Sequence, residues 1–345
     1  MPSISEYLYF PAKVCCQVFK MKLSFFDYEL PKEFIAQKPL KDRSGCKMLF
    51  YDKKKDDIKH LIFSDIVELF TPNDLLILND TKVLPAKLFG IVNKTCIEIL
   101  LTREENDIWE ILAKPKKRLK EGTIINFEKG ISCKIISLFP LKAKFNCNIL
   151  NYIEKIGKAP LPPYIKRNSE ESDKENYQTV YAKSLGSIAA PTAGLHWTKE
   201  LLSKLEEKGV SIFYITLHIG KGTFVFPKTE DVEKHKMDSE YVEIPKNFKI
   251  GKKRVIACGT SVVRAIESLE NIEVGKKKFW TDLFIYPGFK FKWTDGMITN
   301  FHFPKSPPFI MTSSFVGLEK LREIYEEAKR KNYRFGSYGD CMIVL

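Results

Sequence analysis

The spacing of apolar and polar residues changes between residues 85 and 158. Short apolar runs follow one another closely there, glycine-containing turn signals separate some of them, and no helical periodicity intervenes. Runs of this length bounded by turn residues are typical of strands. We predict five strands, at Lys87–Val92, Cys96–Leu101, Trp109–Leu112, Thr123–Phe127 and Ser132–Leu138. Closely spaced strands without helices predict a small all-β barrel domain.

Strand and helix patterns alternate on both sides of this segment, which is typical of an α/β fold. The predicted strands are Lys47–Asp52, Asp74–Leu78, Val210–Leu217, Arg254–Cys258 and Asp282–Tyr286. The predicted helices are Pro31–Gln37, Val262–Leu269 and one that Thr198 caps and Gly209 ends. We therefore predict an α/β main domain of residues 21–84 plus 159–345. The barrel domain, residues 85–158, is inserted near the N-terminal third.

Residues 1–20 do not resemble the rest of the chain. They lack the basic start, long apolar stretch and small-residue cleavage site of a signal peptide. Met21 opens a more ordinary start, MKLSFFDYELP. We predict that residues 1–20 are an N-terminal extension outside the folded unit.

Composition narrows the function only a little. The chain of 345 residues is 44% hydrophobic and carries a net charge of +13. This excess favours a polyanionic partner, although a solvated basic surface explains it equally well. The eight cysteines include no CxxC pair, which argues against a zinc site and a disulfide framework and favours a reducing, cytoplasmic compartment. No apolar run approaches the roughly 18 residues of a membrane span.

Polar and glycine-rich clusters stand beside several predicted elements in the second half. Thr192 and Gly194 precede the Thr198 helix, and Gly220, Gly222 and Thr223 follow a buried strand. Loops of this kind bring backbone N–H groups against an anionic or polar ligand, or they are ordinary turns. The glycine pair is followed by Pro227 and not by a helix, which excludes a Rossmann dinucleotide site.

A third cluster lies where a predicted strand passes into a helix. Thr260 and Ser261 open the helix, and Arg264 lies one turn further on. Helix-end N–H groups and a guanidinium suit a carboxylate or phosphate ligand. A hydroxyl N-cap beside a structural arginine ion pair fits the same residues equally well.

Taken in order, the clusters resemble the motif series of the S-adenosylmethionine:tRNA ribosyltransferase-isomerase family, from about Leu23 to the C-terminus. The later motifs are APTAGLHW (190–197), LHIGKGTF (217–224), HKMDSEY (235–241), GTSVVRAIES (259–268), TDLFIYPG (281–288), TNFHFPKS (299–306) and YRFGSYGD (333–340). The earlier motifs are FDYELP (26–31), LILNDTKVLPAKLFG (76–90), PLPPYI (160–165) and YQTVYA (177–182). The chain departs from the family pattern at Trp197, Lys221, Asp238 and Gly336.

The resemblance implies a reaction in queuosine biosynthesis. The ribosyl group of S-adenosylmethionine is transferred and isomerised onto the aminomethyl group of 7-aminomethyl-7-deazaguanine at the wobble position of tRNA. Epoxyqueuosine-tRNA forms, and adenine and methionine leave. The resemblance implies no metal and no cofactor, because S-adenosylmethionine is a co-substrate. We expect a cytoplasmic monomer that binds tRNA and no membrane.

Such a reaction needs proton transfer at the carbon next to the sulfonium, a clamp for the methionine carboxylate and a group near the cation. The candidate catalytic residues are His196, His218 and His302. The candidate substrate-binding residues are Thr192, Gly194, Gly220, Gly222, Thr223, Thr260, Ser261, Arg264, Asp282, Asn300, Lys305, Tyr338 and Asp340. Asp282 or Asp340 is the candidate near the sulfonium.

A basic run in the predicted barrel is the candidate tRNA contact, with a solvated charge run as the alternative. Its residues are Lys114, Lys116, Lys117, Arg118 and Lys120. The alternative enzyme is an S-adenosylmethionine-dependent tRNA methyltransferase, which would release S-adenosylhomocysteine. A non-catalytic RNA-binding protein built around the barrel is the alternative from another class, but most polar clusters lie outside that barrel.

Overall fold

The main body of the protein is built on a nine-stranded sheet. The computed structural model describes residues 21–220, 222, 227, 229–269 and 277–345. The strand order is β15-β13-β12-β3-β14-β16-β17-β1-β2. The strands are β1 (Lys47–Asp52), β2 (Asp57–Ile62), β3 (Asp74–Asn79), β12 (Ser211–Leu217), β13 (Glu240–Ile244), β14 (Arg254–Cys258), β15 (Lys277–Thr281), β16 (Gly296–Asn300) and β17 (Cys341–Val344). The four strands at its centre, β12, β3, β14 and β16, run parallel.

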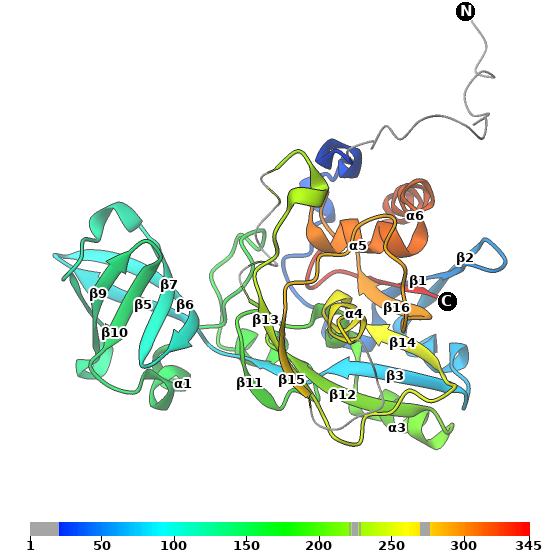
Figure 1. Cartoon of the computed structure of the whole chain (residues 1–345), viewed down its shortest axis with the longest axis horizontal. Helices are drawn as coiled ribbons and strands as arrows, with labels where there is room; N and C mark the ends of the chain where they lie inside the picture. The colour runs from blue at the N-terminus through cyan, green and yellow to red at the C-terminus, as the bar shows by residue number, and fades with distance from the viewer. Residues whose placement is uncertain (1–20, 221, 223–226, 228, 270–276) are drawn as a thin grey trace, which may run out of the picture.

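Helices cover both faces of this sheet (Figure 1). They are α3 (Lys199–Glu207), α4 (Thr260–Glu267), α5 (Pro307–Val316) and α6 (Leu318–Arg330). Alternate residues of β3 point to opposite faces. Leu75 and Ile77 belong to the core under α4, α5 and α6, whereas Leu76 and Leu78 belong to the core under α3. Because β3 is buried along its whole length, its sequence reads as a continuous apolar run.

Six further strands close into a barrel that stands to one side of the main body (Figure 1). They are β5 (Lys87–Val92), β6 (Thr95–Glu105), β7 (Ile108–Lys114), β8 (Ile124–Asn126), β9 (Ser132–Leu138) and β10 (Leu141–Phe145). Ile97, Ile99 and Leu101 alternate along β6 and fill the barrel interior. The predicted fold class, an α/β main domain with a small inserted barrel, is confirmed.

Short elements lie within these two parts and between them. They are η1 (Leu23–Phe26), η2 (Lys32–Phe34), η3 (Arg43–Gly45), η4 (Phe63–Leu69), β4 (Thr81–Val83), η5 (Lys116–Arg118), η6 (Glu128–Gly130), η7 (Ile149–Asn151), α1 (Ile153–Ile156), α2 (Asp173–Asn176), β11 (Ser184–Ser187), η8 (Thr192–His196) and η10 (Val232–Lys234). Among the described helices, none combines the length and apolar character that crossing a bilayer requires. Residues 1–20 lie outside the described residues.

Two predicted elements are wrong. The segment Pro31–Gln37 forms one short 3-10 turn, η2, because its backbone pairs with the chain near the C-terminus: the Ala36 N–H donates to the Phe335 carbonyl over 3.1 Å. The segment Asp282–Tyr286 is not a strand. The carbonyl of Leu283 instead accepts a 2.8 Å hydrogen bond from Nε of Arg264, so it bonds to helix α4 and not to a neighbouring strand.

Candidate active site

A cavity of about 120 Å³, here called the first cavity, lies among the carboxyl ends of β14 and β16 and the start of α4. Six of the predicted site residues line it: Thr192, Thr260, Ser261, Arg264, Asn300 and His302. They come from three separate sequence clusters. A position at the carboxyl ends of parallel strands is where α/β folds bind ligands.

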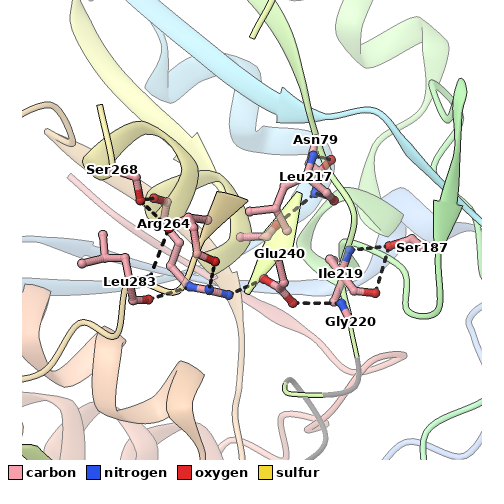
Figure 2. Close-up of polar contacts among 11 residues, drawn as sticks. Asn79, Ser187, Leu217, Ile219, Gly220, Glu240, Arg264, Ser268 and Leu283 are labelled. Carbon is pink, nitrogen blue, oxygen red and sulfur yellow. Dashed lines mark hydrogen bonds and ion pairs between the residues drawn. The ribbon is translucent and has the colours of Figure 1, made fainter. Parts of the chain in front are cut away.

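The start of α4 faces this cavity because of a hydrogen-bond network at its first turn. Gly259 precedes the helix with φ +95°, a conformation that favours glycine. Asn79, at the end of β3, donates to Oγ of Ser261 over 3.3 Å and to the Leu217 carbonyl over 3.0 Å. Figure 2 shows Asn79 against Leu217. Asn79 thereby ties the ends of β3 and β12 to the helix whose free N–H groups can meet an anion.

Arg264 and Glu240 form a buried ion pair at the edge of the cavity (Figure 2). The guanidinium of Arg264 also donates to the Leu283 carbonyl over 2.8 Å, and Oε1 of Glu240 accepts the Gly220 N–H over 2.9 Å. The sequence left open whether Arg264 clamps a ligand or makes a structural ion pair. The ion pair is present, and Arg264 still lines the cavity.

One buried polar atom in the lining, Oδ1 of Asn300, has no hydrogen-bond partner among the described residues. Leaving a buried polar atom unsatisfied costs roughly 1–3 kcal/mol. A ligand that fills the cavity can supply the missing donor to Asn300. This unsatisfied oxygen indicates that the cavity is a binding site.

His302 lines the same cavity and is partly exposed. Its Nε2 lies 2.6 Å from the hydroxyl of Thr299, and its backbone N–H donates to the Tyr325 hydroxyl over 3.0 Å. Burial lowers the pKa of His302 to about 3. The imidazole is therefore neutral at physiological pH and a weak proton acceptor.

His218 lies in a different cavity, of about 480 Å³, between the barrel and the main sheet. We call it the second cavity. Thr81 fixes the ring through a 2.8 Å contact with Nδ1, and a methyl group on Gly186 would lie only 2.7 Å from Nε2. Burial lowers the pKa of His218, while the charge of Asp80 opposes this shift. The ring is neutral near pH 7, with Nε2 available to accept a proton.

His196 is buried and lines neither of these cavities. Its Nδ1 lies 3.1 Å from Sγ of Cys46 and its Nε2 lies 3.3 Å from Nδ2 of Asn300. Cys46, His196 and Cys341 place their ligand atoms within 4.8 Å of one another, and are the metal-ligand-type cluster found among the described residues. A hydrogen bond from Cys341 and the charge of His196 lower the pKa of the Cys46 thiol. The cluster contains no CxxC motif, so the sequence pattern did not indicate it. The absence of a bound metal stays a prediction.

Several other predicted site residues lie outside the first cavity because their polar groups bond to the protein itself. The carboxylate of Asp340 accepts from the Arg334 backbone over 2.7 Å, and the Tyr338 hydroxyl donates to Asp173 over 3.0 Å. Lys305 forms an ion pair of 2.5 Å with Asp27. Neither Asp340 nor Lys305 is placed to meet a ligand in that cavity.

The remaining candidates are positioned as follows. Asp282 is exposed and lines neither cavity, and its role near the sulfonium stays a prediction. Gly194 is packed against Tyr181, whose hydroxyl would lie 2.2 Å from an added Cβ. Gly220 lines the second cavity, and Gly222 packs against Asp238. Thr223 and the family departure Lys221 lie outside the described residues.

The basic run on the barrel is exposed. Lys114 ends β7, and the four other cations lie on η5 or just after it. All five side chains face solvent, while Leu119 between them is buried in the barrel core. Within the described part of the chain, none of the five takes part in an ion pair with an acidic residue.

The sequence-based selection missed two residues that organise the site. Glu240 pairs with Arg264, and Asn79 joins two strand ends to α4. Both stand inside motifs that carried the resemblance, HKMDSEY and LILNDTKVLPAKLFG. Membership of these motifs could therefore have identified Glu240 and Asn79. Residue type alone pointed instead to the histidines.

Comparison with known proteins agrees with the resemblance. The model of the family described as Queuosine biosynthesis protein matches residues 23–344. A curated protein of Halothermothrix orenii, named S-adenosylmethionine:tRNA ribosyltransferase-isomerase, is 44% identical and aligns with 94% of this chain and 100% of its own length. One of Sulfurihydrogenibium sp. with the same name is 46% identical at the same coverage.

A solved structure supports the fold as well. The crystal structure of S-adenosylmethionine tRNA ribosyltransferase from Thermotoga maritima is 32% identical, with a TM-score of 0.53. The match covers 93% of this chain and 100% of that one. The family model spans nearly the whole chain, and the two curated relatives are 44% and 46% identical to it. The chain therefore belongs to the queuosine biosynthesis protein family, the family of the S-adenosylmethionine:tRNA ribosyltransferase-isomerases.

Proposed function

We propose that the protein transfers and isomerises the ribosyl group of S-adenosylmethionine onto the aminomethyl group of 7-aminomethyl-7-deazaguanine at the wobble position of tRNA. The product is epoxyqueuosine-tRNA, and adenine and methionine are released. Family membership over residues 23–344 supports this reaction. The structural observation that carries it is the convergence of residues from separate motifs on one cavity, whose lining includes a buried amide oxygen with no partner in the described part of the chain.

The first cavity suits the charged and aromatic parts of S-adenosylmethionine. The start of α4 offers N–H groups and the hydroxyls of Thr260 and Ser261 to a methionine carboxylate. Phe284 and Tyr164 provide aromatic faces for adenine or for the sulfonium. Oδ1 of Asn300 needs a donor, and an exocyclic amine is one.

The volume of this cavity limits how much of the co-substrate it holds. About 120 Å³ is small beside the roughly 300–1,000 Å³ of typical ligand sites. Ile219 and Glu240 line both this cavity and the second one. S-adenosylmethionine therefore extends from the first cavity toward these two residues, which brings its ribose close to His218.

The three histidines then differ in what they can do. His218 is neutral, and its Nε2 is free of the Thr81 contact that holds Nδ1, so it is the best candidate to accept the proton of the carbon next to sulfur. His302, with a pKa of about 3, is better suited to hydrogen bonding than to proton uptake. His196 contacts Asn300 and orients that amide.

The exposed basic run on η5 and its flanks is the proposed contact for the tRNA backbone, because surface cations that have no carboxylate partner among the described residues attract phosphates. The proposal includes no metal and no cofactor. We also propose that the protein acts as a monomer in the cytoplasm, where S-adenosylmethionine and tRNA are both available.

One assay tests the reaction directly. The protein is incubated with S-adenosylmethionine and tRNA that carries the precursor base, and adenine is measured by chromatography while the base is analysed by mass spectrometry. Release of adenine and methionine together with a heavier base is expected. Production of S-adenosylhomocysteine would instead identify the alternative, a tRNA methyltransferase.

A further inference from the structure

The second cavity is bounded by both parts of the protein. Arg103 and Trp109 come from β6 and β7 of the barrel, and Tyr241 and Trp280 come from β13 and β15 of the main sheet. Its volume, about 480 Å³, falls within the range typical of ligand sites. A ligand there touches both the barrel and the catalytic sheet.

The two cavities meet at a pair of buried residues. Ile219 and Glu240 line both of them, with exposed fractions of 5% and 2%. Figure 2 shows Glu240 between Arg264 and the backbone of Gly220. His218 lines only the second cavity, directly before Ile219. Two ligands that fill the two cavities would therefore approach each other at Glu240, within reach of His218.

A row of rings forms one wall of the second cavity. Trp280 is 53% exposed and meets Tyr241 edge-on, with ring centroids 5.6 Å apart. Tyr241 stacks on His218 at 5.8 Å, and the Arg103 guanidinium lies over one face of the Trp280 ring, 4.8 Å from its centroid. Exposed aromatic faces beside arginine are the usual platform for unstacked bases in RNA-binding proteins.

The charge around the cavity differs from that of the whole chain. Four acidic residues line it beside the single arginine Arg103, whereas the net charge of the protein is +13; they are Glu104, Glu110, Asp238 and Glu240, the last of which is paired with Arg264. Carboxylates repel phosphates, so the cavity does not suit an RNA backbone. They accept hydrogen bonds from N–H groups, and they favour a cationic amine. A guanine-type base with an aminomethyl group offers both.

We propose that the second cavity holds the aminomethyl-bearing wobble base of the tRNA, stacked on Trp280, while S-adenosylmethionine reaches Ile219 and Glu240 from the first cavity. This inference rests on the proposed function, because it assigns positions to the two substrates of that reaction. The basic run of the barrel and the base cavity then contact different parts of the same RNA.

Trp280→Ala tests the stacking contact. Binding of an anticodon stem-loop RNA that carries the precursor base is measured by fluorescence anisotropy at fixed salt, and S-adenosylmethionine binding is measured by calorimetry. RNA affinity should fall roughly 5-fold to 100-fold, the range for removing the ring under one stacked base, and Trp280→Phe should restore most of it. Affinity for S-adenosylmethionine should stay within about twofold. Phe25→Ala is the matched control, because Phe25 is 49% exposed and lines neither cavity.

The same RNA without a base at the wobble position separates base stacking from backbone binding. Wild-type protein should bind it more weakly, and Trp280→Ala should weaken that binding no further. Equal weakening of both RNAs by Trp280→Ala, or no weakening of either, would overturn the placement of the base. Adenine release by the wild-type protein in the same samples distinguishes the two proposals. If the wild-type protein releases no adenine, the proposed function is rejected. If it releases adenine normally but Trp280→Ala binds the RNA as tightly as wild type, only this inference is rejected.

Discussion

Arg264 of α4 and Glu240 of β13 are 6% and 2% exposed, and each is the charge partner of the other. The pair joins α4 to β13, and the two cavities meet at its Glu240. A buried charge that loses its partner keeps the cost of desolvation without the attraction that offset it. The ion pair therefore supports the fold as well as the site.

Arg264→Met should lower the free energy of unfolding by about 3–5 kcal/mol, because it leaves the Glu240 carboxylate buried and unpaired. Urea denaturation followed by circular dichroism measures the change. Lys278→Met is the control on the adjacent strand, since Lys278 and Glu243 form a largely exposed pair of 3.3 Å. That variant should be destabilised by no more than about 1 kcal/mol. Similar destabilisation of the two variants would contradict the structural role of the buried pair.

Gly186 allows the ring of His218 to occupy its position, since an added Cβ would lie 2.7 to 2.9 Å from three atoms of the imidazole. Gly186→Ala should displace the ring and lower kcat/KM for adenine release by about 100-fold, because a misplaced proton acceptor reduces the rate by that much. Steady-state kinetics with saturating tRNA measure the decrease.

A double substitution shows whether Gly186 acts through His218. In a protein that already carries His218→Ala, the Gly186→Ala change should have little further effect on kcat/KM, because coupled residues are not additive. An equal additional decrease in both backgrounds would mean that Gly186→Ala damages the site by another route.

Much of the fold was predictable because hydrophobic pattern and local capping agree with tertiary structure. β3 is a continuous apolar run and is buried on both faces. Thr198 caps α3 through a 3.2 Å bond from the Leu201 N–H, and Gly209 follows that helix with φ +87°, as the sequence indicated. The barrel strands were recognised from turn residues, although β10 was missed.

The site was less predictable, because it depends on contacts between distant segments. Cys46 meets His196 across 150 positions, and no motif contains both. The carboxylate of Asp340 bonds to Arg334 within its own motif, so a polar residue that looked suited to a ligand is satisfied internally. Membership of a motif identified the right segments, but only the packing of those segments shows which side chains face the cavity.

His302 predicts how stability depends on pH. Its pKa is about 3 in the folded protein against 6.5 ordinarily. Below pH 6.5 the unfolded chain therefore takes up a proton that the native state does not. Stability should fall with decreasing pH by up to about 1.4 kcal/mol per unit, with the partial exposure of the ring reducing this figure. Urea midpoints of wild type and His302→Gln between pH 7 and pH 5 measure it, and their stability difference should narrow as pH falls. Parallel curves would show that His302 titrates alike in both states.

The exposed basic run of the barrel predicts a salt dependence for tRNA binding. Replacing Lys116, Lys117 and Arg118 with glutamine should weaken tRNA binding. The negative slope of log affinity against log salt concentration should become shallower by about 0.7–0.9 for each phosphate that is no longer neutralised. Filter binding at several salt concentrations measures the slope. Lys54→Gln with Lys55→Gln is the control, because these exposed lysines lie in the β1–β2 turn at the opposite end of the molecule (Figure 1). The control should leave the slope unchanged, since only cations next to the bound RNA release its counterions. An unchanged slope in the barrel variant would mean that η5 carries a solvated charge run and that other cations hold the tRNA.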